Sequence, residues 1–351
     1  MMETSTTRKA RRSERGRPAR PTQKDIALAA GVSQAAVSLV LNKNETPSVP
    51  DATRARILKV ARELGYQPNH PARMLRSART MTLACVIPDI TNPFYPGLVR
   101  GVQTVAAPAG YDVLIYDTDG RPEGEARAIN WLSQGRADGV VAAFLHLRVP
   151  ELAVLARKGV PVVRLESLHK PDGPLAIDSV YIDNVEAAAA MTRYLIACGH
   201  RRIAMIQAEF GRPSERRALG YSRVMQEAGL APDIVTDTAY SEVSGARAMR
   251  RLLERRGDRP TAVFGASDVL ALGAMEAARS AGLAIPEDIA IAGFDDIPVA
   301  KLLGLTTVRQ PEFDLGALAA ATLIKRLQPG GLQAPGQSHG LKFEIMKRAS
   351  V

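Results

Sequence analysis

The chain has 351 residues and a formal net charge of +10 at pH 7, which suggests two or three domains. Its apolar content of 46% argues against global disorder. No apolar run approaches the roughly 18 residues of a membrane span, and the basic N-terminus has no apolar signal core, so we expect a cytoplasmic protein without membrane contact. Cys85 and Cys198 lie in apolar stretches and are expected to be buried free thiols.

Common catalytic and cofactor motifs are absent from the sequence. It contains no P-loop, no GxGxxG and no GxSxG, and its five histidines are not spaced as metal ligands. We therefore expect no enzyme activity, no cofactor and no metal site.

The charge is confined to one end of the chain. Residues 1–20 and residues 21–79 each carry a net charge of +5, whereas the residues beyond 79 hold 30 basic and 30 acidic side chains. A local excess of this kind predicts a polyanionic partner for that end only, either nucleic acid or a membrane surface. Residues 1–20 are predicted to be a disordered basic tail. Within it, Arg15–Pro18 resembles an AT-hook core, and the alternative is a solvated tail that adds sequence-independent affinity.

A helix-turn-helix is predicted after the tail. Thr22 is placed to cap a first helix, which Gly31 ends, and Ser33 is placed to cap a second helix that continues through Asn42. A third helix follows and ends near Gly65. Two short helices joined by a glycine turn indicate DNA binding, with a plain helical bundle as the alternative.

Residues beyond 80 alternate between apolar strands and helices. Such alternation predicts parallel sheets covered on both faces. Two units are expected, at about 80–181 and 182–309, followed by a helix at 312–328 and a strand near 341–349. The strand segments are LACVIPD, YDVLIYDT, VVAAF, PVVRLES, RIAMIQA, TAVFGAS and IAIAGF.

Ordered motifs along the chain resemble the LacI/GalR family of transcription regulators. In the head they are DIALAAGVSQAAVSLVLN, TRARILKVARELGYQPN and ARMLRSART, and in the body IPDITNPFY, DGVV, YIDN, GHRRIAMI, TAVFGASDVLALGA, IAGFDD and LTTVRQP. The resemblance covers about residues 21–350. It implies an α/β fold class, with a small all-α helix-turn-helix domain and two Rossmann-like parallel-sheet subdomains like those of periplasmic sugar-binding proteins.

The resemblance also implies domain boundaries. The helix-turn-helix domain would span 21–67, a hinge 68–79, and an effector-binding and dimerisation domain 80–351. Three crossovers would connect an N-subdomain (about 80–181 plus 312–340) to a C-subdomain (about 182–309 plus 341–351). The last helix would return to the first subdomain and the last strand to the second.

The second helix would lie in the major groove. Gln34 and Ala35 would face base edges there, and Ser33 and Ser38 would contact phosphates. Leu39 stands where relatives often carry Arg or another polar residue that reads a base. We therefore expect weaker or different base recognition at this position. The alternative is that Leu39 is partly buried in the core of the domain. The full set of expected DNA-binding residues is Thr22, Ser33, Gln34, Ala35, Ser38, Leu39, Asn42, Asn69, Arg73 and Leu75.

Residues 69–77 resemble the family's hinge helix. Asn69 would cap it, and Pro71 is tolerated because it falls in the first turn. Leu75 matches the leucine that relatives wedge into the minor groove, where an apolar wedge kinks the duplex. Ordinary hinge packing is the alternative for Leu75.

Effector contacts are expected just after the strands, because ligands of open α/β sheets bind beyond the carboxyl ends. An arginine with carboxylates and aromatic rings suits a polyhydroxylated ring. Asp268 could instead cap a helix, Phe94 could be core and Asp117 a solvated loop residue. The expected effector-binding residues are Asn92, Phe94, Tyr95, Asp117, Glu166, Arg217, Phe264, Asp268 and Asp295.

Together these features predict a sequence-specific DNA-binding transcriptional repressor. Its partners would be a near-palindromic double-stranded operator, a sugar-like effector that controls operator affinity, and a second copy of the chain. The missing C-terminal leucine heptad favours a dimer over a tetramer. The alternatives are a sugar-binding transport-type protein, an α/β enzyme with a DNA-binding head, and a regulator responding to nucleosides or purines.

Overall fold

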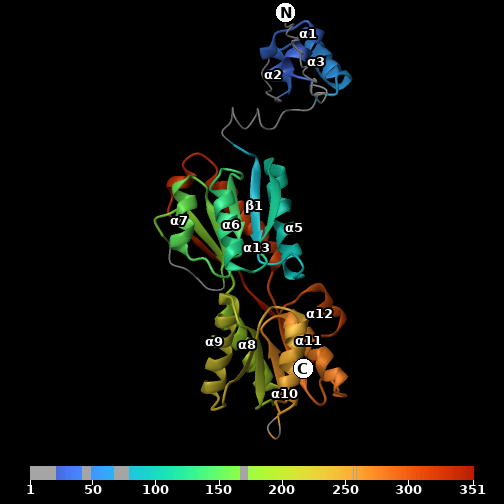
Figure 1. Cartoon of the computed structure of the whole chain (residues 1–351), viewed down its shortest axis with the longest axis vertical. Coiled ribbons are helices and arrows are strands. Elements are labelled where there is room, and N and C mark those ends of the chain that lie inside the picture. Colours follow the sequence, from blue (N-terminus) through green and yellow to red (C-terminus); the bar gives the residue numbers. More distant parts are fainter. Residues whose placement is uncertain (1–20, 42–48, 67–78, 167–172, 256, 258) are drawn as a thin grey trace, which may run out of the picture. The chain divides into compact units, whose positions relative to one another are not determined.

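The structure is a computed structural model that describes residues 21–41, 49–66, 79–166, 173–255, 257 and 259–351. Two compact units are present, residues 1–78 and residues 79–351 (Figure 1). The predictions for the basic tail, the hinge helix, Asn42, Asn69, Arg73 and Leu75 lie outside the described residues.

The described residues of the first unit form the three helices that were predicted. They are α1 (Gln23–Ala30), α2 (Gln34–Leu41) and α3 (Asp51–Glu63). Thr22 and Asp25 form a capping box at the start of α1, and Gly31 ends the helix with a φ of 63°. Ser33 Oγ accepts a hydrogen bond from the Ala36 amide at 3.2 Å at the start of α2. Ile26, Val37 and Ile57 form the core of the unit and are fully buried or nearly so.

The first sheet of the larger unit has the strand order β11-β5-β4-β3-β1-β2, and its paired strands run parallel. Alternate residues of β1 point to opposite faces: Leu83 and Cys85 pack with α5 and α13, and Ala84 and Val86 pack with α6 and α7. Both faces are therefore covered. The strands are β1 (Thr82–Ile87), β2 (Asp112–Asp117), β3 (Gly139–Ala142), β4 (Val162–Glu166), β5 (Ile177–Tyr181) and β11 (Ser338–Gly340), and the helices are α5 (Phe94–Ala106), α6 (Pro122–Leu132), α7 (Val149–Arg157) and α13 (Glu312–Arg326).

The second sheet has the order β12-β10-β9-β8-β6-β7. Its strands are parallel except β12, which pairs antiparallel with β10. One large apolar core surrounds it. The strands are β6 (Ile203–Ala208), β7 (Asp233–Asp237), β8 (Ala262–Gly265), β9 (Ala290–Asp295), β10 (Thr306–Arg309) and β12 (Glu344–Met346), and the helices are α8 (Asn184–Ala197), α9 (Arg212–Glu227), α10 (Glu242–Leu253), α11 (Asp268–Ser280) and α12 (Pro298–Leu302).

The chain passes between the two sheets three times, after β5, after β10 and after β11 (Figure 1). Helix α13 thus returns to the first sheet, where it packs closely on α5. A Cβ atom added at Gly101 would lie 2.0 Å from the Phe313 carbonyl oxygen, and one added at Gly316 would lie 2.0 Å from the Leu98 carbonyl oxygen. Glycine at both positions lets the two backbones touch.

The predicted fold class is confirmed, with some differences in detail. Strands β5, β7, β10 and β11 were not among the predicted strands. The segments of β5 (IDSVY) and β10 (TTVR) contain polar residues, β7 is only partly buried, and β11 has three residues. Cys85 is buried as predicted. The prediction that Cys198 is buried is wrong, because Cys198 follows the last turn of α8 and is exposed.

No single helix in the described part of the chain is long and apolar enough to cross a membrane. The pair α1 and α2 passes the same length and composition test only with a bend of 111° between the helices, and these two helices form the core of the first unit.

Candidate functional site

A cavity of about 530 Å³ lies in the larger unit and is lined by residues of both sheets' subdomains. Pro88 and Asn92 follow β1, Glu166 ends β4, Arg217 lies on α9 and Asp295 ends β9. This position beyond the carboxyl ends of parallel strands is where open α/β sheets bind ligands. The volume falls within the range of small-molecule sites.

Six of the nine predicted effector-binding residues line this cavity. They come from four separate strand ends or helices, and only the fold brings them together. They are Asn92, Phe94, Tyr95, Glu166, Arg217 and Asp295.

The other three predicted positions do not line it. Phe264 lies on β8 and is fully buried in the core of the second sheet. Asp268 turns inward, where it accepts hydrogen bonds from Thr307 Oγ1 at 2.5 Å and from the Ile297 amide at 2.9 Å. Burial raises the pKa of Asp268 to about 7.

Asp117, the third of these positions, shapes a loop. Its carboxylate accepts hydrogen bonds from the Ile90 amide at 2.8 Å and the Asp119 amide at 2.7 Å. It thereby ties together the loops that follow β1 and β2, and Asp119 of the same loop does line the cavity.

Arg217 and Asp295 form a buried ion pair at the cavity wall. Arg217 Nη2 lies 3.4 Å from Asp295 Oδ1, and both side chains are only 6% exposed. Arg217 also donates from Nε to Asn184 Oδ1 at 2.6 Å and from Nη1 to the Ala266 carbonyl at 2.5 Å. Its guanidinium lies 3.7 Å from the centre of the Phe294 ring, in cation–π contact.

The backbone at the end of β9 aims the Asp295 carboxylate. Asp295 and the following Asp296 have φ values of 123° and 59°, a backbone conformation that residues other than glycine rarely adopt. Gln310 Nε2 donates to Asp295 Oδ1 at 2.7 Å. Burial raises the pKa of Asp295 to about 6, against the opposing effect of Arg217. Backbone strain that is held in place by hydrogen bonds and ion pairs is typical of a functional site.

Aromatic rings form much of the apolar lining. Phe94 and Tyr95 meet edge to face with ring centres 5.3 Å apart. Phe144, Phe210 and Tyr240 also line the cavity and were missed in the sequence. Phe210 follows β6, so it could have been predicted in the same way as Asn92, as a residue just beyond the carboxyl end of a strand. Tyr240 follows β7. This strand is only partly buried, so its sequence was not predicted to be a strand.

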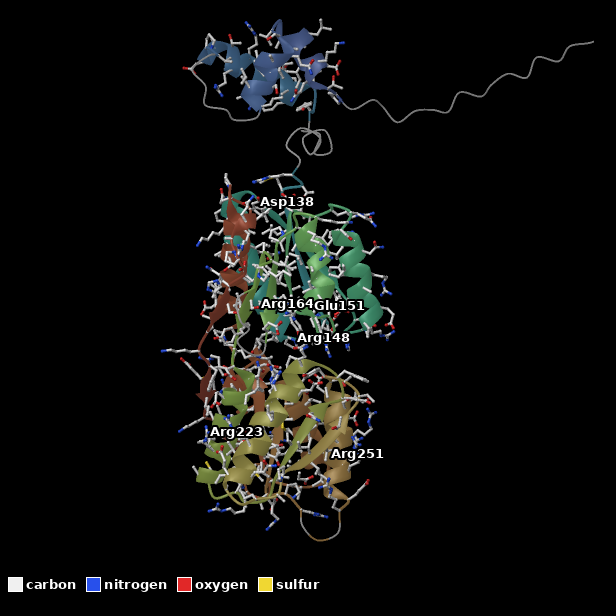
Figure 2. All side chains as sticks on the ribbon, turned by 90° about the vertical axis from the view of Figure 1, so that its left-hand side faces the viewer. Asp138, Arg148, Glu151, Arg164, Arg223 and Arg251 are labelled. Atoms are coloured by element: carbon white, nitrogen blue, oxygen red, sulfur yellow. The ribbon has the colours of Figure 1, made fainter. Side chains whose placement is uncertain are left out.

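Glu166 faces the cavity beside an arginine of the same strand. Arg164 Nη2 and Glu166 Oε1 are in direct contact, and the two side chains are 3% and 4% exposed. Burial lowers the pKa of Arg164. Figure 2 shows Arg164 and Arg148 toward the end of the first subdomain that faces the second, whereas Asp138 lies at its far end and accepts hydrogen bonds from the Thr80 and Met81 amides.

Helix α2 presents the predicted DNA-reading face. Ser33, Gln34 and Ala35 are exposed, whereas Ser38 and Leu39 are half-buried. Thr22 is exposed, but its hydroxyl donates to Asp25 Oδ2 at 2.8 Å, so it already serves the start of α1.

No group of three or more His, Cys, Asp or Glu side chains that could hold a metal occurs among the described residues. What the cavity offers is ion-paired polar groups and aromatic faces, which suits binding rather than chemical turnover.

Comparison with known proteins agrees with this architecture. Residues 22–69 match the family model for bacterial regulatory proteins of the lacI family, and residues 192–351 match a periplasmic binding protein-like domain. The ribose operon repressor of Escherichia coli K12 is 37% identical over 337 residues, covering 94% of this chain and 99% of the repressor. The transcriptional repressor CytR of the same strain is 34% identical over 336 residues, covering 94% and 96%.

A solved structure is also similar along nearly the whole chain. The transcriptional regulator CelR in complex with cellobiose has a TM-score of 0.69 and 32% sequence identity, and the match covers 95% of this chain and 100% of CelR.

The fold and the cavity define a helix-turn-helix regulator with a periplasmic-binding-protein-like body. The chain belongs to the LacI family of bacterial transcriptional regulators. It is a transcriptional repressor of that family and not an enzyme. The resemblance seen in the sequence is thereby confirmed, and the transport and enzyme alternatives are set aside.

Proposed function

We propose that this chain is a homodimeric repressor of the cytoplasm, that it binds a near-palindromic operator, and that a sugar-type effector in the cavity controls its operator affinity. A two-fold dimer matches a palindrome because each helix-turn-helix reads one half-site. Similar proteins are a ribose operon repressor and a regulator solved with cellobiose, which supports a sugar-type effector.

The observation that carries the proposal is the hydrogen-bond network around Arg217. Its partner Asn184 directly follows the first crossover, and Gln310, which holds Asp295, lies in the second crossover. A ligand that competes for Arg217 or Asp295 therefore alters contacts at two of the three segments joining the subdomains. An effector shifts the equilibrium between two arrangements of the subdomains only if it binds one arrangement more tightly than the other.

At the DNA end, Gln34 and Ala35 would read base edges in the major groove, and Ser33 and Ser38 would hold phosphates. Both residues proposed to read bases are exposed on α2. The proposed hinge, residues 68–79 including Leu75, would couple the arrangement of the two subdomains to operator affinity. The body would comprise residues 80–351, divided at the crossovers.

A nucleoside or purine is the second candidate effector. The rings of Phe94, Phe144, Phe210 and Tyr240 along the cavity favour it, since a flat base stacks on aromatic faces.

The test begins with operators selected by the full chain from a random duplex pool. The expected product is a two-fold symmetric site that binds two chains. Fluorescence anisotropy measures the binding, and light scattering measures the number of chains in the complex. D-ribose, cellobiose and adenosine are then titrated onto the complex. A sugar that changes operator affinity at least about tenfold supports the proposal. An asymmetric site bound by one chain, or an effect of adenosine alone, contradicts the dimer or the sugar-type effector respectively.

A further inference from the structure

The charged side chains that line the cavity are mostly acidic, and each arginine among them already has a carboxylate partner. Two arginines and four carboxylates are among the described residues that line it: Arg121, Arg217, Asp89, Asp119, Glu166 and Asp295. There is no lysine or histidine among them. Cations are thus the minority in this lining, which is the reverse of what an anionic ligand requires.

Each lining arginine has a carboxylate partner. Arg217 pairs with Asp295, and Arg121 Nε lies 2.9 Å from Asp119 Oδ2 at the solvent-exposed rim. Behind the lining, Arg164 pairs with Glu166. An anion that sought any of these guanidinium groups would have to displace a carboxylate. For the two nearly buried pairs, that carboxylate would remain close to the anion and repel it.

Two residues that line the cavity carry buried side-chain oxygens whose hydrogen bonding is incomplete. Tyr240 Oη and Glu166 Oε1 are buried, and neither makes a hydrogen bond of ordinary geometry among the described residues, although Tyr240 lies beside Ser214 and Glu166 pairs with Arg164. A buried polar group without a partner is costly, so a ligand that supplies the missing hydrogen bonds is favoured. A carboxylate needs a donor, which a hydroxyl provides and a phosphate dianion does not.

From this charge balance we propose that the cavity selects an uncharged, hydroxylated effector and discriminates against the phosphorylated or acidic form of the same sugar. The inference rests on the proposed function, and it narrows the effector from sugar-type ligands in general to uncharged ones. Tyr240 acts as a specificity-determining residue, because its hydroxyl pairs with a hydroxyl of the ligand. The aromatic rings cover the apolar face of that ligand.

The test uses the full chain and matched pairs of probes at constant ionic strength. D-ribose is compared with ribose 5-phosphate, and D-glucose with glucose 6-phosphate and gluconate. Binding is measured by isothermal titration calorimetry and by the shift in melting temperature, since a ligand stabilises the state that it binds. The expected result is that a neutral probe binds at least about tenfold more tightly than each of its charged counterparts.

Two variants separate ligand recognition from folding. Tyr240→Phe is expected to weaken binding of the neutral probe about tenfold without lowering the melting temperature of the unliganded chain, because the hydroxyl that it removes makes no hydrogen bond of ordinary geometry among the described residues. Leu219→Ala, which truncates a half-exposed side chain that does not line the cavity, is the control for nonspecific effects and should leave binding unchanged.

The outcomes are distinct. Tighter binding of a phosphate or acid form than of its neutral sugar overturns this inference and leaves the proposed function standing. Unchanged affinity in Tyr240→Phe overturns the role of the tyrosine. If no sugar in either form binds, the sugar-type effector of the proposed function fails, and this inference fails with it.

Discussion

Arg217 Nη2 lies 3.4 Å from Asp295 Oδ1 at a cavity wall where both side chains are 6% exposed. The two residues come from α9 and from the end of β9, and their other hydrogen bonds reach Asn184 and Gln310 beside two crossovers. This single contact therefore connects the proposed effector site to two of the segments that join the subdomains.

Arg217→Ala should abolish the response to the effector while the chain still binds its selected operator. The substitution should also lower the free energy of unfolding by about 3–5 kcal/mol, because it leaves the buried Asp295 carboxylate without its partner. Urea denaturation and operator titrations with increasing D-ribose measure the two effects.

Arg223→Ala is the matched control for that variant. Arg223 pairs with Glu186 at 2.7 Å on an exposed helix face, so its loss should cost about 1 kcal/mol or less. An unchanged dose–response curve for Arg217→Ala, or equal destabilisation by the two variants, would contradict the role assigned to the buried pair.

The stability of the body should depend on pH through Asp268. Burial raises the pKa of Asp268 to about 7 in the folded chain, above its ordinary value of 3.8. The folded state therefore holds this proton more readily than the unfolded state, and the associated stability is lost as the pH rises from about 4 to about 7.

Asp268→Asn removes that dependence. The stability of the wild type relative to this variant should fall between pH 4.5 and pH 7.5, measured by urea denaturation at each pH. Asparagine can still accept from the Ile297 amide and donate to Thr307 Oγ1, so the variant keeps the local contacts. A constant difference across this range would show that Asp268 does not titrate there.

Gln34→Ala should weaken binding to the selected operator by about 1–3 kcal/mol, that is roughly 10- to 100-fold, because a bidentate base contact is lost. Binding to random duplex should change little. Gln34 is exposed, so the unfolding transition should not move. Fluorescence anisotropy on both duplexes measures the difference.

Lys59→Ala provides the comparison for this prediction. Lys59 is an exposed residue of α3, 3.8 Å from Glu63, and removing its charge should change affinity for both duplexes alike. If Gln34→Ala also weakens both duplexes equally, then Gln34 does not read sequence.

Leu75→Ala is predicted to weaken specific binding much more than non-specific binding, because a wedge helps only the duplex that kinks correctly. Leu75 lies outside the described residues, so this expectation rests on the match of ARMLRSART to the family. The same pair of duplexes tests it, and equal losses on both would remove the proposed wedge.

Gly101→Ala should destabilise the larger unit by about 1–3 kcal/mol or more, since the added methyl group would meet the backbone of α13. Gly173→Ala is the control, because no atom lies within 4 Å of its added Cβ atom. The two variants are compared by urea denaturation of the full chain. Equal stability of the two would mean that α5 and α13 do not pack as described.

The sequence was most informative where a long apolar strand precedes a polar or aromatic residue. Asn92, Phe94, Tyr95 and Asp295 all line the cavity, and each follows or ends a fully apolar run. In such cases the end of the strand, and hence the edge of the sheet, is evident from the pattern alone.

The errors have two physical causes. The sequence does not show which way a side chain turns after a strand, and Asp268 turns inward to Thr307 and the Ile297 amide. Nor does it reveal short or half-exposed strands, so Tyr240 after β7 was missed. The partners of Arg217 come from distant parts of the chain and are visible only in the fold.

Reciprocal linkage between DNA and effector tests the central claim most directly. The affinity of the full chain for its selected operator is measured with and without saturating neutral sugar, and the affinity for that sugar with and without operator. Thermodynamic linkage requires the two affinity ratios to agree. We expect equal ratios of at least about tenfold in the wild type and a ratio of one in Arg217→Ala. Sugar binding that leaves operator affinity unchanged in the wild type would contradict an effector-controlled repressor.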